Sequence, residues 1–202
     1  DIAEKEGQEL ADKLNGTFFH HDVTDEDRWI EIRSETEKKY GRIDVLVNNA
    51  GIVKPGDPEN QTTEEYKFTM SVHMDSTFFG CKYVIPVMAK NGGGSIVNMC
   101  SIASVQGESY VAAYCAAKGA IEAYSRAVAV HCGLAKNGVR CNTIHPSGIA
   151  TPMVASVPAL MAEKFGNTGV QDAPVESNKV GEPMDIAPVS YTHLTLPTIP
   201  TV

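Results

Sequence analysis

Two patterns of apolar and polar positions alternate along the chain, short apolar runs and longer segments with helical spacing. The run 43–47 is nearly continuous in apolar residues, which is typical of a parallel strand that is covered on both faces. Further short runs at 95–100 and 138–144 predict two more strands, and the segment 17–21 predicts a shorter one.

The segments between these runs have apolar residues at helical spacing. They predict helices at 2–14, 25–40, about 63–88 and 114–134. Thr24 can N-cap the second helix and Gly41 can end it, while Pro86 is expected to kink the third helix near its end.

Strands that alternate with helices imply βαβ units with right-handed crossovers. The expected fold class is therefore α/β, a doubly wound, Rossmann-like parallel sheet in three α/β/α layers. The chain begins without Met, and we expect the fold to be incomplete at both ends, with one partial domain over residues 1–187. The Thr/Pro-rich segment 188–202 has no helical period, and we expect it to be unrelated to that domain, either artefactual coding or disordered.

Composition narrows the classes of function. The 202 residues are 43% hydrophobic, enough for one α/β domain, and the formal charge of -8 argues against nucleic acid and anionic membranes as partners. No apolar run approaches the length of a membrane span. The cysteines are scattered through apolar segments without C-x-x-C spacing, as expected for buried thiols in a reducing cytoplasm, and no metal site is predicted.

The segment Ser101–Lys118 carries the clearest candidate chemistry. Tyr114 and Lys118 stand four residues apart at the start of a predicted helix, which places their side chains on one face. A free phenol has a pKa of about 10, and an ammonium group one turn away lowers that pKa towards neutrality. Ser101, at the end of a predicted strand, could hydrogen-bond a substrate oxygen at the same point. The three residues predict a proton-transfer site, with a solvated helix face as the plain alternative for the Tyr–Lys pair.

Four motifs in a fixed order resemble one family. They are Asn48-Asn-Ala-Gly51 after a strand, Ser101 thirteen residues before Tyr114, Tyr114-x-x-x-Lys118 on a helix, and Pro146-Ser-Gly-Ile-Ala-Thr151 after a further strand. Each lies at the carboxyl end of a predicted strand or in the helix that follows, where open α/β sheets bind ligands. Residues 1–187 thus resemble the short-chain dehydrogenases/reductases, in the branch with a Tyr-x-x-x-Lys active site. Within that family, the stretch 144–153 is similar to bacterial hydroxysteroid dehydrogenases.

This resemblance implies NAD(P)-dependent oxidation of a secondary alcohol, or the reverse reduction of a ketone. Tyr114 would be the acid/base, Lys118 would lower the pKa of Tyr114 and hold the nicotinamide ribose, and Ser101 would fix the substrate oxygen. The hydride would belong to the nicotinamide. The implied partners are a small alcohol or ketone and further copies of the same chain, in a tetramer or dimer formed through helices around 63–90 and 113–134.

The same resemblance implies cofactor contacts from the ends of several strands. Besides Tyr114 and Lys118, the implied contact residues are Asp1, Asp22, Val23, Asn49, Ala50, Gly51, Val72, Pro146, Gly148, Ile149 and Thr151. Asp1 would bind the adenosine ribose 2′-OH and repel a 2′-phosphate, so NAD is expected as the cofactor over NADP. Asp22 would bind the adenine amino group, and capping of the next helix is its alternative role.

The sequence departs from the family's pattern at two places that bear on the site. The pyrophosphate-binding turn Thr-Gly-x-x-x-Gly-x-Gly does not occur in the 202 residues. His73 stands where the family usually has an Asn of the proton relay, and an imidazole there could hydrogen-bond and titrate near neutrality, with a structural role as its alternative. Both departures keep a second class open, a non-catalytic dinucleotide-binding module on the same fold. Among enzymes, the alternatives to a hydroxysteroid substrate are a sugar, another cyclic alcohol or a 3-oxoacyl thioester, and the segment 154–179 is expected to cover the substrate pocket.

Overall fold

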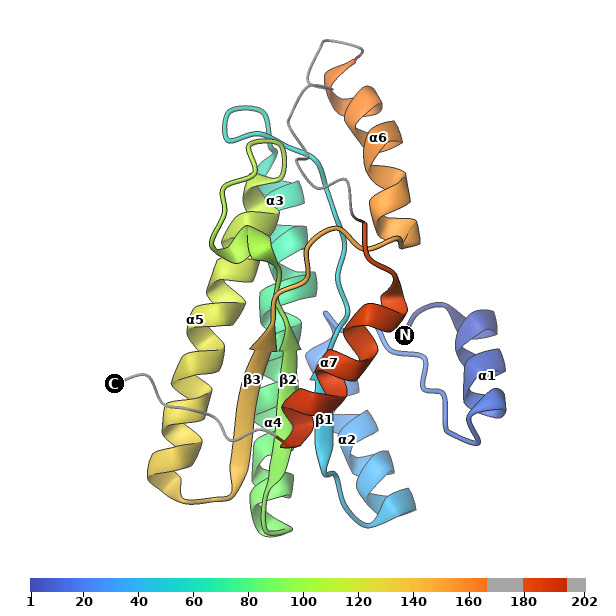
Figure 1. Cartoon of the computed structure of the whole chain (residues 1–202). Helices are drawn as coiled ribbons and strands as arrows, with labels where there is room; N and C mark the ends of the chain where they lie inside the picture. The colour runs from blue at the N-terminus through green and yellow to red at the C-terminus, as the bar shows by residue number, and fades with distance from the viewer. Residues whose placement is uncertain (167–179, 196–202) are drawn as a thin grey trace.

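Three parallel strands form the sheet of this chain in the computed structural model, which describes residues 1–166 and 180–195 (Figure 1). Strand β2 (Gly94–Met99) lies in the middle, between β1 (Val45–Asn48) and β3 (Val139–Ile144). In the register, Val45 stands beside Ser95 and Gly94 stands beside Val139. The predicted parallel α/β class is confirmed, and these three strands agree closely with the apolar runs that predict them.

Helices connect and flank the strands. In chain order they are α1 (Glu4–Lys13), α2 (Glu26–Tyr40), α3 (Thr63–Met70), the π-helix η1 (Ser71–Asp75), α4 (Ser76–Lys90), the 3₁₀-helix η2 (Ile102–Ser104), α5 (Ala112–Ala135), α6 (Pro152–Phe165) and α7 (Pro183–Thr195). The predicted helices at 2–14, 25–40 and 114–134 correspond to α1, α2 and α5. Within residues 1–166 and 180–195, no helix combines the length and apolar character needed to cross a membrane.

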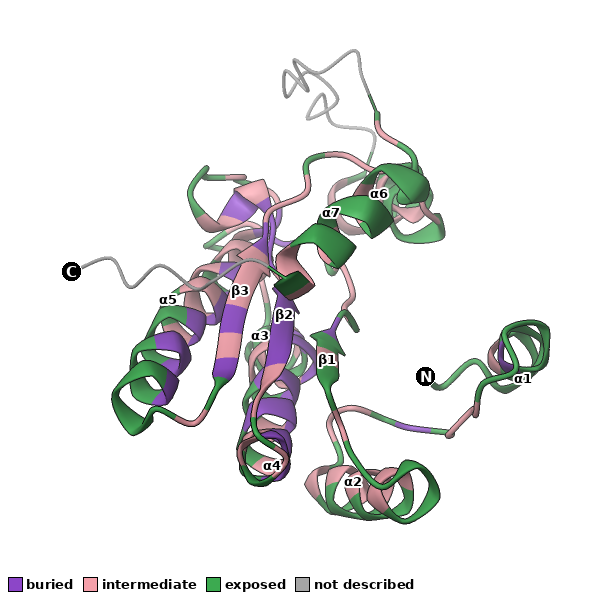
Figure 2. Cartoon of the chain, turned by 60° about the horizontal axis from the view of Figure 1, so that its bottom comes forward, coloured by how far each residue is buried: buried purple, intermediate pink, exposed green. Residues whose placement is uncertain are grey.

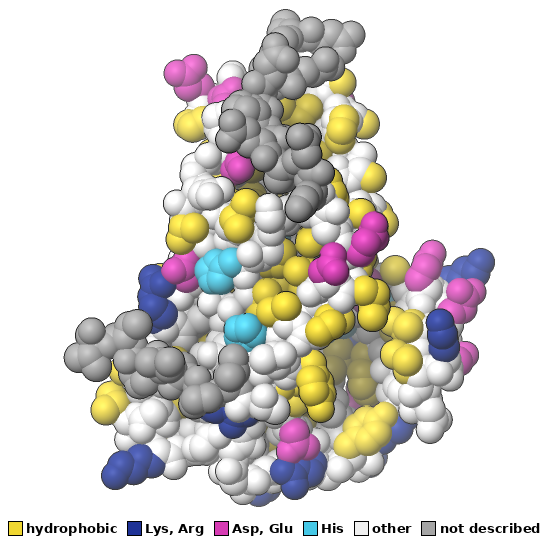
Figure 3. Space-filling model, viewed as in Figure 1, with side chains coloured by type: hydrophobic (Ala, Val, Ile, Leu, Met, Phe, Trp, Pro, Cys, Tyr) yellow, Lys and Arg dark blue, Asp and Glu magenta, His cyan; other side chains and the backbone are white. Residues whose placement is uncertain are grey.

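Helices cover both faces of the sheet, which gives the predicted three layers (Figure 1). On one face, α4 and α5 bury an apolar core against β2 and β3. Its members include Cys81, Val84, Met88, Ile96, Val128, Cys132, Val139 and Cys141. On the other face, the side chains of Arg140 and Asn142 donate to carbonyl groups of α7, because alternate residues of a strand point to opposite faces. The face that carries α7 shows hydrophobic side chains across its middle (Figure 3).

Helix α2 begins at a side-chain cap. Asp25, and not Thr24, provides this cap, since its carboxylate accepts two backbone N–H groups of the first turn, over 3.0 and 3.2 Å. The predicted cap is therefore wrong by one residue, and the observed one adds a negative charge at the positive end of the helix dipole. Gly41 ends α2 in the left-handed conformation, with φ 79°, as predicted.

Strand β1 is an edge of the sheet (Figure 2). Val45 and Val47 are 42% and 44% exposed, so the prediction that this strand is covered on both faces is wrong. The segment 17–21 is irregular and not the predicted strand, and its backbone makes two hydrogen bonds with Asp1, of 3.1 and 3.3 Å. In the described part of the chain no strand lies beyond β1, and a segment without a neighbouring strand cannot form a regular hydrogen-bond ladder.

A π-helix interrupts the single helix predicted at 63–88. The turn η1 places one extra residue between α3 and α4, and its central residue His73 is only 1% exposed. Turns of this type re-aim side chains and are frequent at functional sites. Beyond it, α4 continues through Pro86 to Lys90.

Helix α7 overturns part of the prediction for the end of the chain. It continues through Pro188 to Thr195, across the predicted domain boundary, and its last turn contacts β3. Residues 188–195 are thus helical although their sequence has no helical period, because packing against the sheet can stabilise a helix that its own residues favour weakly. Residues 196–202 lie outside the described part, and an artefactual origin of 188–202 stays a prediction.

Candidate active site

Ser101 follows β2 at the carboxyl edge of the sheet and caps η2. Its Oγ accepts the backbone N–H of Ala103 over 3.2 Å. The preceding residue, Cys100, donates its N–H to the carbonyl of Ile144 over 2.8 Å, which holds the end of β2 to the end of β3. The position of the Ser101 hydroxyl is therefore set by two bonds that involve the backbone, one made by the preceding residue and one accepted by the hydroxyl itself.

Tyr114 and Lys118 lie one turn apart near the start of α5, as their spacing predicts. The Nζ of Lys118, a residue 3% exposed, donates to the carbonyl of Met99 over 2.7 Å and lies 5.4 Å from the centre of the Tyr114 ring. The hydroxyl of Ser101 lies near enough to the phenol of Tyr114 to act on its pKa. The structure thus brings together the three residues that the sequence predicts as a proton-transfer site.

Burial dominates the electrostatics of this cluster. It raises the pKa of Tyr114, although the nearby Ser101 hydroxyl acts in the opposite direction. It also lowers the pKa of Lys118 to about 8. The expected lowering of the Tyr114 pKa by Lys118 is not met in this structure. The ammonium group lies over the phenol ring and bonds to Met99, and the loss of hydration outweighs its attraction for a phenolate.

His73 packs against the phenol of Tyr114. The two ring centroids are 5.2 Å apart and the ring planes stand at 86°. The Nε2 of His73 lies 2.8 Å from the carbonyl oxygen of Ile52 and 3.2 Å from its nitrogen, and the shorter contact assigns the proton to Nε2. Nδ1 is then a bare acceptor, buried without a partner among the described residues.

Burial lowers the pKa of His73 to about 4, and the positive charge of Lys118 acts in the same direction. The ring is therefore neutral at pH 7, and the expectation that it titrates near neutrality is wrong. A neutral imidazole with a free Nδ1 can still accept a hydrogen bond at this position.

The loop after β1 passes directly over His73. A Cβ atom on Gly51 would stand 2.7 Å from the His73 Cε1, so the loop has no room for a side chain there. Val72 is buried beside His73 in η1, whereas Asn49 and Ala50 are exposed at the edge of the sheet. Of these four predicted cofactor residues, Gly51 and Val72 thus border the cluster and the other two face solvent.

The turn that follows β3 approaches Ser101 through Pro146. The carbonyl of Pro146 accepts the N–H of Ile102 over 3.0 Å and lies 3.5 Å from the Ser101 Oγ. Pro146 is therefore the predicted cofactor residue of this turn that contacts the catalytic cluster.

The rest of the turn pairs with the segment before α7. Gly148 accepts the N–H of Gly181 over 2.9 Å, and Ile149 bridges to Gly181 in parallel. Thr151 caps α6, and its hydroxyl accepts the N–H of Val154 over 3.3 Å. Gly148 and Ile149 therefore hold this turn to the segment before α7, and Thr151 starts α6. Residues 167–179, part of the segment predicted to cover the substrate pocket, lie outside the described range.

Asp1, Asp22 and Val23 make local contacts ahead of α2. Asp1 accepts the N–H of Ala3 over 2.9 Å, Asp22 accepts both the N–H and the hydroxyl of Thr24, and the carbonyl of Val23 accepts the indole N–H of Trp29. Asp22 does not cap α2, so its alternative role is wrong. The cofactor roles of the three residues stay predictions, and they concern the adenosine end, which is remote from the nicotinamide in a dinucleotide.

A series of hydrogen bonds between buried polar side chains joins the elements that carry the site, and sequence patterns do not reveal it. The side-chain amide of Asn48 donates to Asn98 over 2.8 Å, and Asn98 donates to the hydroxyl of Ser125 over 2.8 Å. These bonds join β1, β2 and α5 inside the core. The one signal in the sequence is a polar residue, Asn98, within the apolar run that forms β2.

The cluster fits the nicotinamide end of a dinucleotide. An ammonium group has three donors, and Met99 takes one from Lys118 in the described part of the chain, which leaves two for ribose hydroxyl groups. The pyrophosphate end is not matched in the same way, because the Gly-rich turn does not occur in these residues.

A parallel sheet whose carboxyl edge joins Ser, Tyr and Lys in this order defines the class of short-chain dehydrogenases/reductases. Residues 1–192 match the model of a family described as enoyl-(acyl carrier protein) reductase, and the chain therefore belongs to this branch of the short-chain dehydrogenases/reductases. The family uses NAD or NADP.

Individual relatives agree with this assignment. The chain is 41% identical over 161 residues to a 3-beta-hydroxysteroid dehydrogenase of Comamonas testosteroni, covering 78% of this chain and 63% of the relative. It is 38% identical over 186 residues to an NADP-dependent (R)-specific alcohol dehydrogenase of Lentilactobacillus kefiri, covering 90% and 72%. A solved short-chain dehydrogenase/reductase of Burkholderia xenovorans superposes with a TM-score of 0.79 at 29% identity, covering 96% of this chain and 74% of that one. The chain thus spans about two thirds of the length of these relatives.

Proposed function

We propose that this chain carries the proton-transfer site of an NAD(P)-dependent oxidoreductase that interconverts a secondary alcohol and a ketone. The observation that carries the proposal is the convergence of a half-buried Tyr114 with Ser101 and with the buried Lys118. A pair on a solvated helix face would not bury the lysine to 3% exposure or anchor its ammonium group at the end of a strand.

Each residue has a distinct part in this proposal. Ser101 holds the substrate oxygen, because backbone bonds fix its hydroxyl beside that of Tyr114. Tyr114 takes the proton from an alcohol or returns it to a ketone oxygen. Lys118 remains mostly protonated at pH 7 with a pKa of about 8, and its charge favours the phenolate as the proton leaves. The bound nicotinamide supplies or accepts the hydride.

His73 acts in this proposal as a positioning residue for Tyr114. Its edge-to-face contact holds the phenol ring, and its hydrogen bond to the carbonyl of Ile52 holds the imidazole. The free Nδ1 offers an acceptor for a hydroxyl group or a water molecule in a proton relay. A neutral ring suits this part, since a cation beside Lys118 would be repelled.

The proposed substrate class is a cyclic secondary alcohol of the hydroxysteroid kind. The stretch 144–153 and the 3-beta-hydroxysteroid dehydrogenase relative support it. We further propose NAD over NADP, on the acidic residue Asp1, although one relative is by name NADP-dependent. Exposed apolar residues on α4 and α5, among them Phe78, Val130 and Leu134, support assembly into a homo-oligomer.

The test uses a chimera in which the Comamonas relative supplies the segment ahead of Asp1, and with it a Gly-rich turn. We expect oxidation of cyclic secondary alcohols, including 3-hydroxysteroids, to be faster with NAD than with NADP. Sugars and 3-oxoacyl thioesters are assayed in parallel to rank the substrate classes.

Replacing the phenol separates catalysis from binding. Tyr114→Phe should lower kcat by roughly 100-fold or more while dinucleotide binding persists. Tyr110, a half-buried tyrosine four residues earlier and ahead of α5, provides the matched control, and Tyr110→Phe should leave kcat unchanged. Turnover that survives Tyr114→Phe would refute the mechanism, and dinucleotide binding without any turnover would favour the binding-module alternative.

A further inference from the structure

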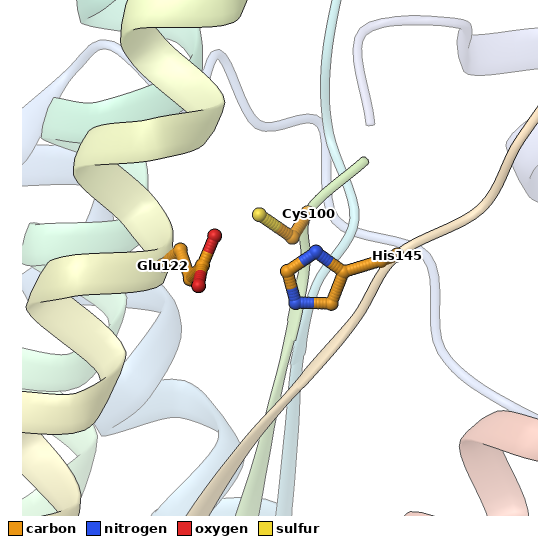
Figure 4. Close-up of side chains that lie close together, drawn as sticks. All are labelled: Cys100, Glu122 and His145. Atoms are coloured by element: carbon orange, nitrogen blue, oxygen red, sulfur yellow. The ribbon is translucent and has the colours of Figure 1, made fainter. Parts of the chain in front are cut away.

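Three potential metal ligands lie close together, one of them the residue that precedes Ser101 in the chain. Cys100 directly follows β2, Glu122 projects from α5, and His145 directly follows β3 (Figure 4). One ligand atom from each side chain lies within 4.8 Å of the ligand atoms of the other two. Cys100 is 2% exposed, and the other two residues are half-buried.

The hydroxyl of Ser104 shows that these side chains face a common point. The Ser104 Oγ lies 3.1 Å from the His145 Nδ1, and the hydroxyl is near enough to Cys100 and Glu122 to act on the pKa of each. That separation is close to the edge of a tetrahedron with metal–ligand distances of about 2.0–2.1 Å, which is roughly 3.3 Å. The Ser104 hydroxyl therefore already stands at the distance from His145 that a fourth ligand would take.

We propose that Cys100, Glu122 and His145 bind a zinc-type divalent cation, with the Ser104 hydroxyl or a water molecule as the fourth ligand. Thiolate, imidazole and carboxylate are the ligands of protein zinc sites, and sulfur favours zinc over magnesium or calcium. The two negative ligands balance the charge of a divalent ion. The site lies outside the proposed proton-transfer reaction and does not depend on it.

Binding requires modest rearrangement. The ligand atoms lie within 4.8 Å of one another, so the longest separation closes by at most about 1.5 Å. Glu122 can supply this movement because its other partner is Arg126 on the exposed side of α5. The thiol of Cys100 donates to the carbonyl of Lys118 over 3.1 Å, and its proton leaves when the metal binds. Burial raises the pKa of this thiol, so the metal displaces the proton rather than meeting a free thiolate.

A bound ion would join the ends of β2 and β3 to α5. The His145 Nδ1 also lies 3.2 Å from the backbone oxygen of Ser101, so the ion would rigidify the segment that carries this serine. The expected effect is structural, a gain in the stability of the folded chain that grows with metal concentration.

The test is a titration of the reduced 202-residue chain with Co²⁺ alone, followed by displacement with Zn²⁺. We expect one equivalent to bind, with visible bands of tetrahedral cobalt and a near-ultraviolet thiolate charge-transfer band. Cys100→Ser should remove the charge-transfer band. Glu122→Gln and His145→Asn should weaken binding about tenfold or more. Zn²⁺ should raise the thermal midpoint of the unsubstituted chain and not that of the variants.

Two matched substitutions guard this result. Cys115→Ala removes a half-buried thiol outside the cluster, and His131→Asn removes an exposed imidazole on the same helix, so both should keep the spectrum. Glu122→Gln preserves shape at a half-buried position and tests the site even if Cys100→Ser fails to fold. Absence of stoichiometric binding, a charge-transfer band that persists in Cys100→Ser, or equal losses in the control variants would overturn the proposal. None of these readouts measures turnover, so failure of the proposed oxidoreductase would leave them unaffected.

Discussion

The imidazole of His73 stands edge-on to the phenol of Tyr114, with centroids 5.2 Å apart and ring planes at 86°. The two residues come from η1 and α5, and the π-helical turn aims the imidazole at the phenol. The Ile52 carbonyl holds the Nε2 of the imidazole, and the ring packs so close to Gly51 that a Cβ atom there would stand 2.7 Å from its Cε1. The orientation of the proposed acid/base therefore depends on a residue far away in the sequence.

The first prediction concerns the stability of the chain in acid. Folding lowers the pKa of His73 from 6.5 to about 4, so the unfolded state binds this proton more readily than the native state. Stability is then full above about pH 6.5 and falls as the pH drops towards 4, by about 3 kcal/mol for this group. In urea unfolding from pH 7 to about 4.5, His73→Asn should lose less stability than the unsubstituted chain.

His21 also has a pKa lowered by burial to about 4. It therefore contributes a loss of stability at low pH both in the unsubstituted chain and in His73→Asn. The difference between them therefore isolates His73. His131→Asn, at an exposed position, should show the slope of the unsubstituted chain. Equal slopes for His73→Asn and the unsubstituted chain would disprove the assigned burial effect.

The second prediction concerns the loop over His73. In Gly51→Ala the new methyl group would meet the imidazole at 2.7 Å, and we expect a loss of about 1–3 kcal/mol from overpacking. Gly107→Ala is the control, since no atom lies within 4 Å of the position that its methyl group would take, and its effect should stay within about 0.5 kcal/mol. Denaturant midpoints compare the two, and similar midpoints would show that His73 can move aside.

The third prediction separates two adjacent asparagines. Asn48→Ala leaves the buried side-chain oxygen of Asn98, Oδ1, without its hydrogen-bond donor, and it should destabilise the chain by about 1–3 kcal/mol. Asn49→Ala removes an exposed side chain and should change stability by less than about 0.5 kcal/mol. Chemical denaturation measures both. A larger loss in Asn49→Ala would contradict the polar chain as a support of the sheet.

The fourth prediction tests the cap of α2. Asp25→Ala should cost about 1 kcal/mol, because two N–H groups lose their acceptor and the helix dipole loses a favourable charge. Thr24→Ala removes a contact with Asp22 but no cap, and it should cost less. Thermal unfolding of both variants decides between them, and the reverse order would restore Thr24 as the cap.

The sequence by itself determines the features that depend on neighbours a few residues apart. Helix spacing places Tyr114 and Lys118 on one face, the apolar runs locate β1, β2 and β3, and Gly41 ends α2. Each of these follows from local backbone geometry, which the residues within one or two turns largely set.

Tertiary structure decides the features that join distant residues. It bonds Lys118 to Met99, and it leaves β1 as an edge because strand order depends on the whole sheet. It also gathers Cys100, Glu122 and His145 from three separate parts of the chain, and their spacing in the sequence does not predict this cluster. Burial then sets the pKa values of His73, Tyr114 and Lys118, because hydration is lost only where several elements close over one group.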